Sequence, residues 1–402
     1  MKESRTILGG VIVLYFLIGL EIMIMISPFA GFFYAAFNPF LLALVQYSAT
    51  RWLTAFFLPH MVLPPGLFLM TIRVAGSVLL VTGAAVFIVC AAQVYINKFG
   101  RRGIALGGLY TVVRHPQYLG LGLAGLGLAI LWPRFLVAVL WVLMVVVYYF
   151  LARDEERRML EQFGAGYRDY MDRTGMFLPK SVEAVFPRLP LPRSSFLRTG
   201  LGLLVLGLAV VGSTFALRFY TVSHLPLWSN GTVTALAILP ADVGMLNHRM
   251  APLLELPEIH SRLKAESGPF LVYFMPRNYI MQGMIADTGD QWQLYKRHHT
   301  FPMIWDWIFH PFRHLENAHA AMHHITESGI QNGQAADATV RRMIFLHVGT
   351  RKGDRSPSAV FGIDTPRNPL FMADVDVHKL GLLEIRDLPS ETGWGRVPTP
   401  MF

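Results

Sequence analysis

A histidine, a tyrosine and a pair of glutamates stand at the two ends of one hydrophobic hairpin of the sequence. The first polar group is Arg114-His-Pro-Gln-Tyr118, and the second is Arg153-Asp-Glu-Glu-Arg-Arg158. Only apolar chain and the turn Pro133-Arg134 separate them. Imidazole and carboxylate groups hold or transfer protons, and carboxylates accept hydrogen bonds from ammonium and hydroxyl groups. Two apolar helices joined by a short turn would bring both groups to one membrane edge, as two walls of a single site.

The first wall is expected at the start of a helix. Gly107 and Gly108 permit close approach of the backbone. Pro116 disfavours helical geometry at His115, so His115 and Tyr118 should lie on either side of the helix start. Free amide N–H groups at such a start bind anions. Taken alone, a His-Pro turn is equally typical of an ordinary helix start.

The second wall places Glu155 and Glu156 at the end of the second helix of the hairpin. Its structural alternative is a solvated helix end, for which a Glu-Glu-Arg-Arg run is typical. Beyond it, Leu160-Glu-Gln-Phe-Gly164 with Tyr167 and Tyr170 predicts an amphipathic helix that lies over the site as a lid.

The elements that must position these walls are membrane helices. The chain has 402 residues, of which 53% are hydrophobic and 15% charged, a composition that soluble proteins rarely show. Several runs approach the roughly 20 residues that cross a bilayer. We expect about five transmembrane helices, over residues 7–37, 66–96, 118–132, 135–151 and 199–217. Residues 40–60 are expected to form an interfacial or re-entrant segment, with a true span as the alternative.

Charge is distributed unevenly along the chain. From Thr221 onward there are 16 Lys and Arg against 17 Asp and Glu, so the whole net charge of +9 comes from the preceding residues. This excess is typical of cytoplasmic loops and does not indicate nucleic-acid binding. It predicts that both walls face the cytoplasm and that the residues after Leu217 lie on the other side, which is the periplasm in a bacterium. The only cysteine, Cys90, lies in an apolar run and is expected to be buried.

The sequence therefore divides into four parts. Residues 1–65 hold the first transmembrane helix and the interfacial segment, 66–180 the membrane core, 181–220 a linker and the last transmembrane helix, and 221–402 an extracytoplasmic α+β domain. The fold class is thus an all-α polytopic bundle followed by an α+β domain. Short β-like runs in that domain cover residues 270–274, 343–348 and 382–385.

The C-terminal domain holds 12 of the 14 histidines. A helix is expected over about 304–327, where histidines four residues apart share a face and could bind zinc or copper. The alternative, a packing helix rich in Trp and His, is favoured, so no metal site is assigned. The metal candidates are His310, His314, His319 and His323. The domain is expected to bind a protein partner or a second ligand, or to cap the bundle.

Two motifs in the membrane core carry a resemblance. Gly108-Leu-Tyr110 with Arg114-His-Pro-Gln-Tyr-Leu-Gly120, then Glu155-Glu156, Phe163-Gly164, Tyr167, Tyr170 and Pro179, resemble the isoprenylcysteine carboxyl methyltransferase and phospholipid methyltransferase superfamily. The resemblance covers about residues 66–179. It implies a small helical bundle that binds S-adenosylmethionine from the cytoplasmic side and admits a lipid or lipid-like substrate laterally from the bilayer.

The resemblance also implies roles for single residues. It implies contacts with the cofactor from His115, Pro116, Tyr118, Gly120, Glu155 and Glu156. His115, Glu156 and Arg153 are the catalytic candidates, and either Arg153 or Arg157 is expected to hold a substrate carboxylate. The methyl acceptor stays open among a carboxyl, an amine and a thiol. Two alternatives stay open as well, an NADPH-dependent reductase on the same fold and a non-catalytic subunit that carries its C-terminal domain.

Overall fold

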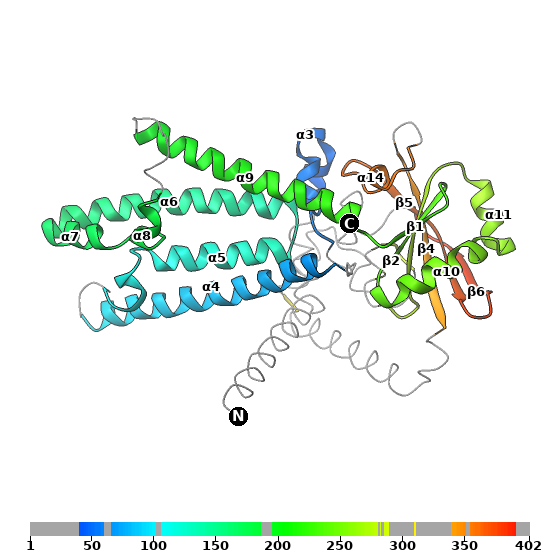
Figure 1. Ribbon diagram of the computed structural model, residues 1–402, viewed down its shortest axis with the longest axis horizontal. Coiled ribbons are helices and arrows are strands. Elements are labelled where there is room, and N and C mark those ends of the chain that lie inside the picture. The colour runs from blue at the N-terminus through cyan, green and yellow to red at the C-terminus, as the bar shows by residue number, and fades with distance from the viewer. Residues whose placement is uncertain are drawn as a thin grey trace, which may run out of the picture. The chain divides into compact units, whose positions relative to one another are not determined.

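Four apolar helices dominate the membrane half of the chain (Figure 1). The computed structural model describes residues 40–59, 66–101, 106–185, 195–279, 282, 285–288, 309–310, 339–350 and 354–390. The helices are α4 (Leu67–Phe99), α5 (Pro116–Leu131), α6 (Phe135–Phe163) and α9 (Ser195–Ser223). Their positions agree with the apolar runs, but α6 continues 12 residues beyond the predicted end at 151 and so carries Glu155 and Glu156 on a helix.

Three of the described helices are long and apolar enough to cross a membrane. These are Leu67–Phe99, Phe135–Phe163 and Thr199–Ser223, while α5 has only 16 residues. The predicted first span at 7–37 lies outside the described residues. Residues 40–46 are helical and are followed by α3 (Ser48–Arg51) and the 3₁₀ turn η1 (Trp52–Thr54), so no helix of spanning length lies within 40–59. A count of about five spans therefore stays a prediction.

Glycines set how closely α4 and α5 approach each other. A Cβ added at Gly127 would lie 2.4 Å from the backbone nitrogen of Leu80, and one added at Gly83 would lie 2.3 Å from that of Ala124. The two backbones are thus in direct contact, as small residues allow in membrane helix pairs. This contact holds α5, the helix that begins at the first wall, against α4.

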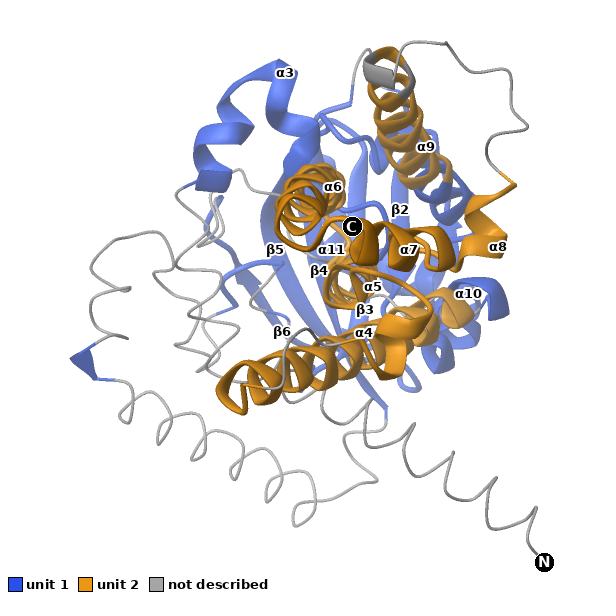
Figure 2. Ribbon diagram, turned by 90° about the vertical axis from the view of Figure 1, so that its left-hand side faces the viewer, with its two compact units in different colours: residues 1–69, 217–402 blue, residues 70–216 orange. Residues whose placement is uncertain are grey.

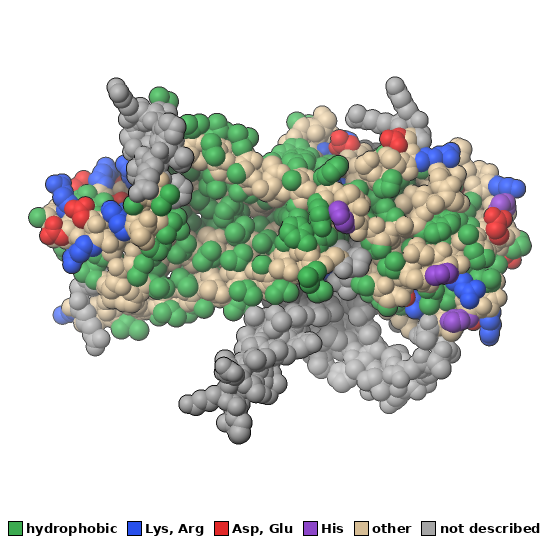
Figure 3. All heavy atoms as spheres, in the orientation of Figure 1, with side chains coloured by type: hydrophobic (Ala, Val, Ile, Leu, Met, Phe, Trp, Pro, Cys, Tyr) green, Lys and Arg blue, Asp and Glu red, His purple; other side chains and the backbone are tan. Residues whose placement is uncertain are grey.

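The polar end of this bundle is built from short elements. The 3₁₀ turn η2 (Gly108–Thr111) precedes α5, and α7 (Ala165–Arg173) follows α6 after Gly164, whose φ of +54° ends the helix. The predicted lid helix is therefore divided, with residues 160–163 in α6 and Tyr167 and Tyr170 in α7. A four-residue helix, α8 (Lys180–Glu183), begins the predicted linker, whose last residues already belong to α9. Charged side chains gather around the α6–α7 end of the bundle, and hydrophobic side chains cover the helices (Figure 3).

The C-terminal half contains a six-stranded mixed sheet in the order β1-β2-β3-β4-β5-β6. Only β2 and β3 are parallel, and the other neighbours are antiparallel. The strands are β1 (Leu227–Ser229), β2 (Val233–Ala237), β3 (Phe270–Pro276), β4 (Val340–Val348), β5 (Arg367–Asp376) and β6 (Gly381–Asp387). Three of them contain the predicted β-like runs, so the expectation of an α+β domain is met by the described residues.

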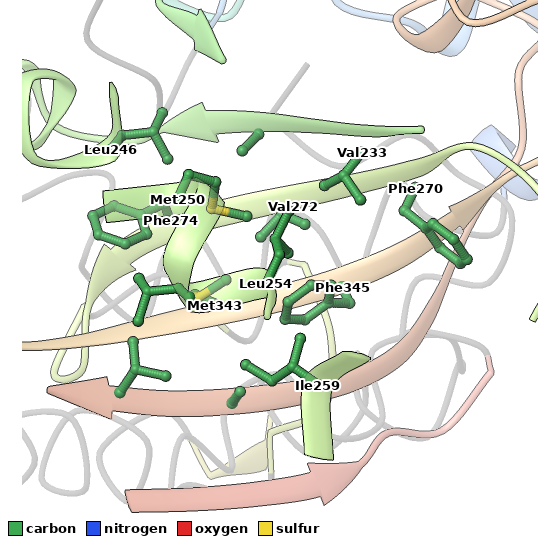
Figure 4. Close-up of a cluster of buried hydrophobic side chains, with 14 of the residues drawn as sticks. Val233, Leu246, Met250, Leu254, Ile259, Phe270, Val272, Phe274, Met343 and Phe345 are labelled. Atoms are coloured by element: carbon green, nitrogen blue, oxygen red, sulfur yellow. The ribbon is translucent and has the colours of Figure 1, made fainter. Parts of the chain in front are cut away.

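A hydrophobic core joins this sheet to the crossover between its parallel strands. The crossover consists of η4 (Pro240–Asp242), α10 (Val243–Leu254) and α11 (Pro257–Ala265). Leu246 and Met250 of α10 and Ile259 of α11 pack on Phe274 and Phe345 of the sheet (Figure 4). Because both faces of β2 are buried, its sequence shows no alternation of apolar and polar residues.

The chain divides into two compact units (Figure 2). One comprises Met70–Ala216, and the other comprises Met1–Leu69 with Leu217–Phe402. In the second unit, Arg218 near the end of α9 donates hydrogen bonds to the carbonyls of Phe56 and Phe361, the latter at 2.5 Å after the short helix α14 (Pro357–Val360). Arg342 and Asp374 form a fully buried pair with two contacts of 2.7 Å.

Candidate active site

His115 lies at the start of α5, as the sequence predicts. It is the residue before the first helical turn, with φ −123° and ψ 60°, and Pro116 is the first residue of the helix. Proline suits that position because it lacks the N–H that would have no partner there. The side chain of His115 is only 6% exposed, so the histidine ring lies inside the bundle end.

The two glutamates of α6 flank this ring. His115 Nδ1 lies 3.5 Å from Glu155 Oε2, and His115 Nε2 lies 3.4 Å from Glu156 Oε1. The second contact has the distance of an ion pair but not the geometry of a hydrogen bond, so Nε2 is buried without a hydrogen-bond partner among the described residues. The structure thus brings together the two walls that the sequence separates by some forty residues.

Tyrosines extend the cluster between α5 and α6. The Tyr118 hydroxyl donates to Glu155 Oε2 at 3.4 Å. The Tyr118 ring stacks on His115 at 5.6 Å between centroids and on Tyr148 of α6 at 5.1 Å. The Phe177 ring is tilted against His115, with 6.0 Å between the ring centroids. The site therefore combines two carboxylates with a row of aromatic rings, a pairing that favours positively charged ligands.

Burial and charge act in opposite directions on the pKa of His115. Burial lowers it, and the close contacts with the negatively charged Glu155 and Glu156 raise it by more, so the pKa lies above its ordinary value. On α7, burial first and the charge of Glu156 second raise the pKa of Tyr167 to about 12. The Tyr167 phenol therefore keeps its proton at neutral pH.

Arg114 belongs to the site, although sequence reasoning did not select it. Its Nε donates to Glu156 Oε1 at 2.5 Å, and its Nη1 donates to the carbonyls of Met171, at 3.0 Å, and Thr174. The only signal in the sequence was its place beside His115. The partners that reveal its role lie 42 to 60 residues away.

The segment after α6 closes against the first wall. The Tyr170 hydroxyl of α7 donates to the carbonyl of Tyr110 at 2.6 Å. In the loop after α7, the carbonyl of Met176 accepts from the amide of His115 at 3.1 Å. Glu183 holds this loop, since its Oε1 accepts from the amides of Met176, Phe177 and Leu178 at 2.6, 3.2 and 3.4 Å. The predicted lid position over the site agrees with these contacts.

Two other residues selected from the sequence are placed differently. Arg153 is exposed and donates to the hydroxyl of Tyr149 at 3.2 Å, without a contact to the glutamate pair among the described residues. Gly120 is buried against α4, where an added Cβ would lie 2.8 Å from the carbonyl oxygen of Gly83. Helix packing accounts for this glycine, and its contact with a cofactor stays a prediction, as does a substrate role for Arg153.

Most of the metal candidates fall in parts of the chain that the structure does not describe. His310 is exposed, and His314, His319 and His323 lie outside the described residues, as does most of the helix predicted at 304–327. Within the described parts of the chain, no three potential ligands gather into a metal site. Cys90 is buried as expected, packed against Tyr110.

Comparison with known proteins concerns the part of the chain that builds this site. Residues 91–166 match the family model described as phospholipid methyltransferase. This segment is thus similar to the phospholipid methyltransferase family. It covers under a fifth of the chain and ends before Tyr167. No curated protein and no solved structure matches the chain.

The family match bears out the resemblance on the segment that contains His115, Tyr118, Glu155 and Glu156. Together with the three apolar helices, it supports an integral membrane methyltransferase. The wider extent expected from the motifs, about 66–179, reaches beyond the matched residues on both sides. The C-terminal sheet lies entirely outside the match.

Proposed function

We propose that this protein is an S-adenosylmethionine-dependent integral-membrane methyltransferase that acts on a lipid or lipid-like amphiphile. The observation that carries the proposal is the cluster of His115, Tyr118, Glu155 and Glu156 at one end of an apolar bundle, within the segment that matches the family. The acceptor is a carboxyl, amine or thiol group, and an apolar bundle surface suits a substrate that stays in the bilayer.

The residues present fit this cofactor. S-adenosylmethionine supplies a methyl group on a positively charged sulfur, together with an amino group, a carboxylate and ribose hydroxyls. Glu155, whose side chain is 47% exposed, offers a carboxylate to the amino group or the hydroxyls. His115, buried against both glutamates, would orient the Glu155 carboxylate toward the cofactor. The rings of Tyr118 and Tyr148 offer faces for stacking or for the positive charge.

Methyl transfer then needs little chemistry from the protein. The residues must hold acceptor and methyl group about 3–3.5 Å apart and exclude water, because the displacement proceeds in line. A carboxylate acceptor needs no base. An amine must lose a proton, and the pair His115 Nδ1 and Glu155 Oε2 can hold that proton between them.

The membrane arrangement is part of the proposal. Thr199 near the start of α9 contacts Tyr149, close to the site, and Phe215 near its other end contacts Phe135 at the opposite end of α6. The chain therefore leaves the bundle at the end away from the site. With the basic excess marking the cytoplasmic side, the site faces the cytoplasm, and the residues after α9 lie on the other side as an extracytoplasmic domain.

Binding of labelled S-adenosylmethionine to the full-length protein in nanodiscs tests the function. We expect binding by the wild type and at least a tenfold loss in His115→Ala and in Glu155→Gln, the scale of losing a charge-assisted hydrogen bond. Asp154→Asn is the matched control, because its carboxylate neighbours the pair on α6 but contacts Arg157 and Arg158 instead. Its affinity should equal that of the wild type.

The same assay separates the alternatives. Binding of NADPH in place of S-adenosylmethionine would identify the reductase, and binding of neither would identify a non-catalytic subunit. Unchanged S-adenosylmethionine affinity in both site variants would show that the site assignment is wrong while leaving the activity standing.

A further inference from the structure

Arg114 joins three separate elements at the edge of the candidate site. Its Nε donates to Glu156 Oε1 on α6 at 2.5 Å, and its Nη1 donates to the carbonyls of Met171 and Thr174 at the end of α7. Its backbone amide, just before α5, donates to the carbonyl of Gly175 at 2.8 Å. One residue thus connects the glutamate pair, the lid helix and the helix start.

The chemistry of these contacts requires an arginine. The last carbonyls of a helix have no partner within the helix, so the carbonyls at the end of α7 need donors from elsewhere. A planar guanidinium with five N–H donors can serve a carboxylate and two carbonyls together, whereas a lysine ammonium is a compact point charge. The Arg114 side chain is 8% exposed, so water is largely kept from these contacts.

The position of Arg114 also distinguishes the two glutamates. Glu156 is 7% exposed and lies between Arg114 and His115. Glu155 is 47% exposed and contacts His115 and the Tyr118 hydroxyl. Neighbours in sequence, the two carboxylates therefore have different surroundings, one enclosed by protein and one open to a ligand.

We propose that Arg114 is a positioning residue that fastens α7 over the site and holds Glu156 against His115, leaving Glu155 as the carboxylate that meets the ligand. The proposal rests on the methyltransferase function proposed above for the ligand, but the fastening of α7 is independent of it. Losing Arg114 would free the carbonyls at the end of α7 and leave Glu156 enclosed without its closest partner.

Hydrogen exchange of the full-length protein in nanodiscs, without ligand, tests the fastening. In Arg114→Gln, backbone amides of residues 170–178 should exchange at least tenfold faster, while those of α4 keep wild-type rates. Arg114→Lys keeps the charge, so its exchange rate should lie between those of the wild type and Arg114→Gln. The lysine variant also provides the test if the glutamine variant does not fold. Arg168→Gln, exposed on the same helix α7, is the matched control and should behave as the wild type. Unchanged exchange in both Arg114 variants would overturn the proposal.

A double-mutant cycle on S-adenosylmethionine affinity tests the division of the glutamates. Arg114→Gln and Glu156→Gln should each weaken binding about tenfold. The double variant should bind as well as the single variant of lower affinity, because both substitutions remove the same interaction. For Arg114→Gln and Glu155→Gln, the fold losses of affinity should instead multiply in the double variant. Independent effects of Arg114 and Glu156 would overturn the proposal. If the wild type does not bind S-adenosylmethionine, the proposed function fails, and hydrogen exchange alone decides whether Arg114 fastens α7.

Discussion

At His115, the pKa is decided by the balance between burial and two carboxylates. The ring is buried at the start of α5, yet the negative charges of Glu155 and Glu156 prevail and raise the pKa. The folded protein therefore binds a proton more tightly at His115 than the unfolded chain does, whose histidine pKa is about 6.5. Folding stability must fall as this proton leaves.

Unfolding measurements across pH should show this dependence. The stabilisation from protonated His115 is complete below about pH 6.5 and is lost as pH rises through the raised pKa of the folded state. The free energy of unfolding of the wild type should exceed that of His115→Gln most near pH 6 and by less near pH 9. Between these two pH values the excess should shrink by roughly 1.4 kcal/mol for every tenfold gain in proton affinity on folding. Thermal unfolding of both proteins in one detergent checks it, and an advantage that grows with pH would contradict a raised pKa.

Single residues of the site were predictable where the sequence carries a motif. His115, Tyr118 and the glutamate pair stand in a recognisable order at the ends of one hairpin. Arg114 was not assigned a role, because two of its three side-chain partners are carbonyl groups and any residue type supplies a carbonyl. Glu183 was missed for the same reason, since it accepts from three backbone amides.

At the scale of elements, the apolar helices within the described residues were predictable and the sheet only in part. Long apolar runs report burial in lipid directly. Strands β1, β2 and β5 were not predicted. Strand β1 has only three residues, and β2 lacks an alternation of apolar and polar residues because both of its faces are buried. Strand β5 contains Pro369 and a register shift opposite Phe345 and Leu346, which obscure its pattern.

The contact between α4 and α5 should tolerate no side chain at its closest points. In Gly127→Leu, the first added carbon would meet backbone atoms of Leu80 and Gly76 at 2.4 and 2.6 Å, so the helices must separate. We expect the free energy of unfolding to fall by about 1–3 kcal/mol, the cost of overpacking a well-packed contact. Gly122→Leu on the same helix is the control, because an added Cβ there meets nothing within 4 Å. Equal thermal stability of the two variants in detergent would contradict the packing.

At the scale of the whole molecule, the charge distribution and the course of α9 favour the proposed arrangement across the membrane. The first 220 residues carry the entire basic excess, and α9 runs from the site end of the bundle to the other end. The sequence alone indicated this arrangement, because loop charge sets orientation. It could not indicate the purpose of the C-terminal sheet, whose residues form a core and buried ion pairs without a recognised motif.

Labelling with a membrane-impermeant maleimide in intact cells should locate both halves. Lys379→Cys, 85% exposed after β5, should react from outside, and Arg157→Cys, 68% exposed on α6, should react only after the membrane is permeabilised. The wild type provides the background, since its single cysteine, Cys90, is 1% exposed. Reaction of the Arg157 variant in intact cells would contradict a cytoplasmic site.

The length of α5 has a consequence for the depth at which the reaction takes place. Sixteen residues make a helix of about 24 Å, shorter than the roughly 30 Å hydrocarbon layer of a bilayer. Either the bilayer thins around α5, or an end of the helix remains below the layer's surface. With His115 at that helix end, the proposed cofactor site would then be level with the lipid carbonyl and headgroup zone. A lipid acceptor would reach such a pocket by lateral diffusion alone, without being lifted out of its leaflet.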